Sequence, residues 1–100
     1  MIDFTKAIGF QWDAGNARKS VDNHDVKQAE AEQVFFNEPL LVVDDPAHSR
    51  SELRFHALGA TNEGRRLHVT FTMRDDETVI RVISARNMHC KERTRYEQET

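Results

Sequence analysis

The sequence predicts an α+β domain in which two helices pack on one side of a largely antiparallel sheet. Two observations predict it. An alternating apolar segment near the start is followed by two helical segments, and four strand-like segments follow Pro39 before a last, polar helix. A chain of 100 residues can bury one hydrophobic core, so residues 1–100 are expected to form a single domain.

A short strand leads directly into the first helix. Residues 8–12 alternate apolar with small or polar side chains, which is the two-residue period of a strand. Asp13 is a preferred N-cap residue, so a helix is expected over 14–23 with Ala17 and Val21 on its inner side.

The second helix is expected over 26–36, after the polar cluster at 23–25. Its apolar positions keep a rough helical stripe: Val26, Ala29, Val34 and Phe35. Pro39 should end it, because proline lacks a backbone donor and favours an extended residue before it.

The chain after Pro39 is expected to form an antiparallel four-strand meander. The strands should cover 40–43, 53–59, 67–74 and 79–84, with a hairpin turn at Asn62-Glu63-Gly64. In the third strand, apolar odd-numbered positions alternate with polar even-numbered ones, so one sheet face should be buried and the other polar. The aromatic residues expected in the core are Trp12, Phe35, Phe36 and Phe71. A polar helix over 88–97 closes the chain and should dock weakly.

Charge is distributed unevenly along the chain. The net charge of −3 argues at first against a nucleic-acid partner. Residues 1–49 carry four basic and nine acidic residues, whereas 50–100 carry ten basic residues, nine of them arginine, against eight acidic ones. A planar guanidinium binds phosphate through two parallel hydrogen bonds. The second half is therefore a candidate RNA-binding face, and a solvated surface of mixed charge is the alternative.

Cysteine content and hydropathy favour a cytoplasmic protein. Cys90 is the single cysteine, so no internal disulfide can form and a reducing compartment is expected. No leader pattern opens the chain, and the longest aliphatic run, 40–43, is too short to span a bilayer. Of the five histidines, only His89 adjoins the cysteine, and paired ligands at metal-binding spacing are missing. Neither a metal nor another cofactor is expected.

Candidate binding residues fall on the polar face of the predicted sheet. Four should converge there once the hairpin pairs its two strands: Arg54, His56, His68 and Arg74. By parity, Arg81 and Arg86 point to opposite faces, so only one of them can join this group unless the strand contains a bulge. Arg81 is the favoured member.

Several short motifs follow one another along residues 8–97. They are Phe10-Gln11-Trp12-Asp13, His24-x-Val26, Val34-Phe35 before Pro39, Asp45-Pro46-Ala47-His48-Ser49, Glu52-Leu53-Arg54-Phe55 with Leu58-Gly59, Ile83-Ser84-Ala85-Arg86, and Glu92-Arg93-x-x-Tyr96-Glu97. In order and spacing they resemble the BrnT family.

The resemblance implies a RelE-like fold and an endoribonuclease toxin that cleaves RNA and stops translation. It also implies a tight complex with BrnA, a ribbon-helix-helix antitoxin, which represses the operon. Operator DNA is then contacted only through the antitoxin, and no membrane is involved.

The chain departs from this pattern around its first helix. Similar proteins usually carry Lys, Asn, Lys and Gly at the positions of Asn16, Ser20, Asn23 and Asp25. Two positive charges are therefore missing, and RNA binding should be weaker if those lysines hold RNA. Besides a ribonuclease toxin, a non-catalytic RNA-binding relative and a protein acting mainly through its antitoxin in operon control remain open.

Metal-independent RNA cleavage needs a base for the ribose 2′-hydroxyl, an acid for the leaving oxygen and cations for the phosphate. We assign phosphate and transition-state stabilisation to Arg54 and Arg81. The base is Glu52 or His56, and the acid is Tyr96 or His68. The residues expected to contact RNA are His68, Arg74, Arg86, Lys91 and Arg93.

Overall fold

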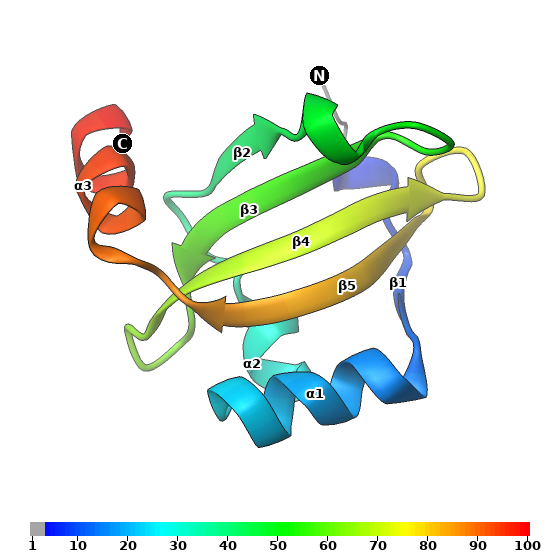
Figure 1. Ribbon diagram of the computed structural model, residues 1–100. Helices are drawn as coiled ribbons and strands as arrows, with labels where there is room; N and C mark the ends of the chain where they lie inside the picture. The colour runs from blue at the N-terminus through cyan, green and yellow to red at the C-terminus, as the bar shows by residue number, and fades with distance from the viewer. Residues whose placement is uncertain (1–3) are drawn as a thin grey trace.

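The structure is a computed structural model that describes residues 4–100, the side chain of Thr5 excepted (Figure 1). Its elements are η1 (Phe4–Lys6), β1 (Gly9–Trp12), α1 (Ala14–His24), α2 (Gln28–Gln33), β2 (Leu41–Asp44), η2 (Pro46–His48), β3 (Arg54–Ala60), β4 (Arg66–Arg74), β5 (Val79–Asn87) and α3 (Cys90–Glu99). This order of strands and helices confirms the prediction.

One five-stranded sheet organises the molecule, with strand order β1-β5-β4-β3-β2. Strands β2 to β5 form an antiparallel meander, and β1 pairs in parallel with β5 at one edge. The turn at 61–64 closes as expected, because Gly64 takes a positive φ of 87° and its amide bonds to the Thr61 carbonyl at 2.9 Å. The predicted α+β class is therefore confirmed.

The helix α1 begins as predicted, but a different side faces the protein. Asp13 accepts hydrogen bonds from the amides of Gly15 and Asn16, which caps the helix. Val21, expected inside, is 42% exposed, whereas Ser20 is buried. The cause is the sheet edge: β1 pairs only with residues 79–82, so α1 lies beside the free edge of the rest of β5 (Figure 1). There the Ser20 hydroxyl accepts the otherwise unpaired amide of Ala85 at 3.2 Å.

The helix α2 is shorter than predicted, because it starts at Gln28. Val26 and Val34 are buried as expected, Ala31 is buried as well, and Ala29, expected inside, is exposed. Phe36 is also a wrong core prediction: it follows the helix and is 76% exposed.

The core fills the sheet face that α2 and the residues after it cover. Its fully buried side chains include Val26, Val34, Leu67, Val69, Phe71 and Val82. Trp12 and Phe35 pack against this cluster, and the Phe35 and Phe71 rings meet edge to face at 5.0 Å. Gly59 is required here because a Cβ would lie 2.7 Å from a Val34 methyl carbon.

The helix α3 covers one end of the opposite sheet face (Figure 1). It docks through a small cluster in which Tyr96, Met88 and Leu58 are buried against Leu41. Tyr96 is the one buried residue of this helix, which agrees with the weak docking expected from its composition. No helix within residues 4–100 combines the length and the apolar character that crossing a bilayer requires.

Candidate active site on the polar face of the sheet

The even-numbered residues of β4 define a polar face, opposite the core. Strand register places three cross-strand rows on it: Arg54–Thr72–Arg81, His56–Thr70–Ser84 and Leu58–His68–Arg86. The expected convergence of Arg54, His56 and His68 is thus confirmed, and the two imidazole rings lie 4.5 Å apart between centroids. The face is less open than expected, because His68, Thr70 and Thr72 are buried.

A bulge in β5 brings both of its arginines to this face. Thr70 pairs with Ser84 but Phe71 pairs with Val82, so Ile83 is an extra residue without a partner in register. As a result Arg81 lies opposite Thr72 and Arg86 opposite His68. Without a bulge only one of these arginines was expected on the polar face; because the bulge is present, both lie on it.

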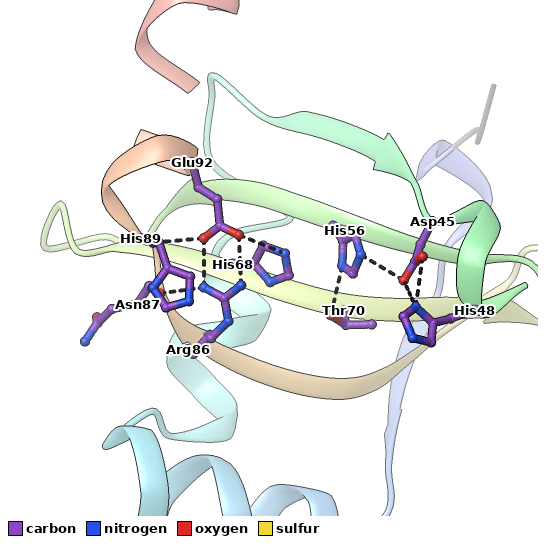
Figure 2. Close-up of polar contacts among 9 residues, drawn as sticks. All are labelled: Asp45, His48, His56, His68, Thr70, Arg86, Asn87, His89 and Glu92. Atoms are coloured by element: carbon purple, nitrogen blue, oxygen red, sulfur yellow. Dashed lines mark hydrogen bonds and ion pairs between the residues drawn. The ribbon is translucent and has the colours of Figure 1, made fainter. Parts of the chain in front are cut away.

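The end of the polar face beneath α3 holds an ionic network centred on Glu92 (Figure 2). Glu92 accepts two hydrogen bonds from the Arg86 guanidinium, at 2.7 and 2.8 Å, and one from the His89 amide at 2.8 Å. Burial alone would raise the pKa of Glu92, but these hydrogen bonds outweigh it and lower the pKa to about 2. The His68 Nε2 atom lies 3.5 Å from the same carboxylate.

His68 is uncharged at neutral pH. Burial lowers its pKa to about 4, and the nearby Arg86 charge acts in the same direction against the opposing effect of Glu92. A neutral imidazole keeps one N–H proton but is a very weak acid, so His68 does not suit the role of general acid.

A second polar group joins two histidines through one carboxylate. The Asp45 carboxylate contacts His56 Nε2 at 2.9 Å and His48 Nδ1 at 3.1 Å (Figure 2). The other ring nitrogen of His56 lies 2.9 Å from the Thr70 hydroxyl. Burial acts to raise the pKa of Asp45, but the hydrogen bond and the charges of the two histidines outweigh it and lower the pKa.

The row between these histidines and the β4–β5 turn has unsatisfied donors. The Nε atom of Arg54 and the hydroxyl of Thr72 are buried, and neither has a hydrogen-bond partner within the described chain. Across residues 4–100, Arg54 and Arg81 also make no ion pair, whereas Arg74 and Arg86 on the same face do. Buried donors without partners are unfavourable unless a ligand satisfies them.

Two predicted site residues are engaged elsewhere. The Glu52 carboxylate is paired with Arg74 at 2.9 Å. The Tyr96 hydroxyl donates to the Pro39 carbonyl at 2.6 Å, and burial raises the pKa of this phenol. Tyr96 thus lies on the inner side of α3, away from the arginine row. It anchors this helix to the segment before β2.

The remaining predicted RNA contacts lie on α3 and at its sheet end. Lys91 and Arg93 are exposed on α3, without an ion pair in the described part of the chain, while Arg86 is already bound to Glu92. Asn23, at the end of α1, lines a shallow cavity of about 450 Å³ together with Arg86 and His89. This position, where the family resemblance implies lysine, therefore borders the polar face.

Sequence reasoning missed three residues that organise the site: Asp45, His48 and Glu92. Each stands in a motif used for the family resemblance, but its role depends on contacts with distant strands, such as Asp45 with His56. Asp25 stands where the family resemblance implies glycine. Its φ of 53° is a backbone conformation that glycine adopts without strain.

Fold and site together define a class: a small α+β protein with a cationic, histidine-containing site on one sheet face, suited to an anionic ligand. A family model described as "Ribonuclease toxin, BrnT, of type II toxin-antitoxin system" matches residues 12–92. The chain therefore belongs to the BrnT family, whose members are ribonuclease toxins of type II toxin-antitoxin systems.

A solved structure supports the fold. The Brucella abortus ribonuclease toxin BrnT, determined at 1.1 Å, is similar with a TM-score of 0.59 and 19% identity, over 83% of this chain and 99% of that chain. A search of curated proteins found no match.

Proposed function

We propose that this chain is an endoribonuclease toxin that cleaves RNA without a metal ion and thereby inhibits translation. The observation that carries the proposal is the Arg54–Thr72–Arg81 row, where two arginines lack ion pairs and two buried donors lack partners within the described chain. A phosphodiester would supply acceptor oxygens to these donors. The neighbouring imidazole groups could transfer protons.

The chemistry starts from the ribose 2′-hydroxyl, which attacks the adjacent phosphorus atom. Negative charge then builds on the non-bridging oxygens, and guanidinium groups held in place before the reaction stabilise it. Arg54 suits this role because part of its guanidinium is already desolvated, which strengthens its interaction with an anion. Arg81 approaches the same row from the other side of Thr72.

The partner we propose is a BrnA-type ribbon-helix-helix antitoxin. Membership of a type II toxin-antitoxin family supports a protein antitoxin. Contact with operator DNA is expected only through that antitoxin, and the cytoplasm, where RNA and the antitoxin meet, is the expected location.

The test is induction of the chain in bacteria, with and without a co-expressed BrnA-type antitoxin. We expect growth arrest with loss of intact RNA, and rescue by the antitoxin. The double variant Arg54→Ala, Arg81→Ala should fold and be harmless. A matched control is Arg95→Ala, because Arg95 pairs with Glu99 on the exposed surface of α3. Arrest by the double variant equal to that of the parent would remove these arginines from the mechanism.

A second candidate is a relative that binds RNA or the antitoxin without cutting RNA. Two points favour it: the family resemblance implies lysines at the positions of Asn16 and Asn23, and Asn23 borders the polar face. In this case the purified protein would bind RNA with an affinity that falls steeply as salt rises, and the RNA would stay intact.

A further inference from the structure

The proposed reaction needs a proton acceptor, and the candidates named from the sequence are already engaged. Glu52 is paired with Arg74, and the Tyr96 hydroxyl donates to a backbone carbonyl. Both ring nitrogens of His56 have partners, at 2.9 Å each. His68 is buried next to Arg86. Each of these groups would have to break a native contact or leave the interior to accept a proton from substrate.

His48 differs because its partnerless ring nitrogen is exposed, whereas the His68 Nδ1 atom, which also lacks a partner in the described chain, is buried. Its Nδ1 atom lies 3.1 Å from both oxygens of Asp45, whereas Nε2 has no partner within the described chain. The side chain is 65% exposed, so Nε2 is accessible to a substrate. Nδ1 therefore carries the proton of the neutral ring, and Nε2 presents a lone pair.

The short helix that carries His48 is fastened to the arginine row. The Asp45 amide donates to the Arg54 carbonyl at 2.9 Å. The Ser49 hydroxyl donates to the Asp45 carbonyl at 2.6 Å and accepts the Arg54 amide at 2.9 Å. These bonds hold the backbone on both sides of His48 next to Arg54, whose guanidinium has a buried donor without a partner.

We propose that His48 is the general base of the site and that Asp45 positions it by fixing its tautomer. This inference rests on the proposed ribonuclease function. His48 Nε2 takes the proton of the ribose 2′-hydroxyl, and the 2′ oxygen forms a bond to phosphorus. The bond from phosphorus to the 5′ oxygen breaks, its electron pair stays on that oxygen, and water protonates it. The products are a 2′,3′-cyclic phosphate and a 5′-hydroxyl end.

The first test compares His48→Gln with the parent, using purified protein and a short single-stranded RNA. We expect the single-turnover cleavage rate to fall by about 100- to 10,000-fold, the range of general-base catalysis, with unchanged RNA affinity. Added imidazole should restore part of the rate in His48→Ala. His24→Gln is the control, because His24 is an exposed histidine at the end of α1 and lines the cavity beside Arg86 rather than the Arg54 row.

The positioning role of Asp45 has its own readout. In Asp45→Asn the new amide can donate to His48 Nδ1, which moves the ring proton to Nε2 and removes the free lone pair. Nitrogen NMR of the His48 ring should report this change of tautomer, together with a slower rate at unchanged RNA affinity.

The outcomes are distinguishable. If the parent does not cleave RNA, the proposed function and this inference both fail. If the parent cleaves and His48→Gln cleaves equally fast, the inference alone is wrong. A His48→Gln variant that loses RNA affinity and rate together would make His48 a binding residue, which also contradicts it.

Discussion

The two ends of the polar sheet face differ in how their charged groups are satisfied. Beneath α3, Arg86 has a bidentate partner in Glu92, and the same carboxylate caps the helix. At the other end, Arg54 and Arg81 flank Thr72 without an ion pair in the described chain, and buried donors there lack acceptors. Beneath α3 the arginine and the carboxylate satisfy each other, although the buried His68 Nδ1 atom there has no partner in the described chain. At the other end we expect an anion to pair with the two arginines. The first end serves stability, and the second is where we expect binding.

The largest expected effect is on cleavage at the unsatisfied end. Arg54→Ala should slow cleavage by about 100- to 1,000-fold, as loss of a transition-state donor does, with little change in unfolding free energy. The matched comparison is Arg86→Ala, because the Arg86 guanidinium is bound to Glu92. The effect is measured by the cleavage rate and the urea unfolding of Arg54→Ala and Arg86→Ala. If Arg86→Ala slows cleavage as much as Arg54→Ala, the two ends do not have different roles.

A smaller effect is expected on stability at the end beneath α3. Glu92→Gln leaves the half-buried Arg86 without its carboxylate, which should lower the unfolding free energy by about 1–3 kcal/mol at pH 7. Urea unfolding measures this value, with Glu99→Gln on the exposed end of α3 as the control. An unchanged midpoint in Glu92→Gln would show that the network adds no stability.

The same network predicts loss of stability in acid. Folding lowers the pKa of Glu92 from 4.5 to about 2, so its contribution is complete above pH 4.5 and disappears as the pH falls toward 2. Folding also lowers the pKa of His68 from 6.5 to about 4. The unfolded chain therefore binds this proton more readily, and stability falls between pH 6.5 and 4. In Glu92→Gln, the unfolding free energy should no longer decline more steeply below pH 4.5.

The smallest effect is expected from removing one hydroxyl. Thr72→Val replaces a buried hydroxyl without a partner by a methyl group of similar size, so stability should stay equal or rise slightly. RNA affinity should fall, because one donor of the row is lost. A variant that is less stable and binds RNA normally would show that Thr72 serves the fold rather than the ligand.

Local patterns predicted much of this architecture. The alternation of 67–74 identified both sheet faces, and Asp13 marked the start of α1. The contact of α1 with a free sheet edge was not predictable, because burying Ser20 depends on where β1 stops pairing. Helical periodicity alone therefore favoured Val21.

Local patterns also predicted part of the candidate site. Strand parity brought Arg54, His56 and His68 together correctly, since register follows from alternation and the hairpin turn. The pairing of each charged group was not accessible, because Asp45 and Glu92 reach the sheet from a loop and a helix. These contacts decide which arginines and which imidazole nitrogens remain available.

The extra residue at Ile83 also changes how relatives of this protein can be compared. Arg81 and Arg86 are five positions apart, an odd spacing that a regular strand would send to opposite faces. A homologue without the bulge must separate its two cationic residues by an even number to present the same surface. The spacing of the pair, more than the identity of either residue, is therefore the feature by which a sequence survey could recognise this arrangement.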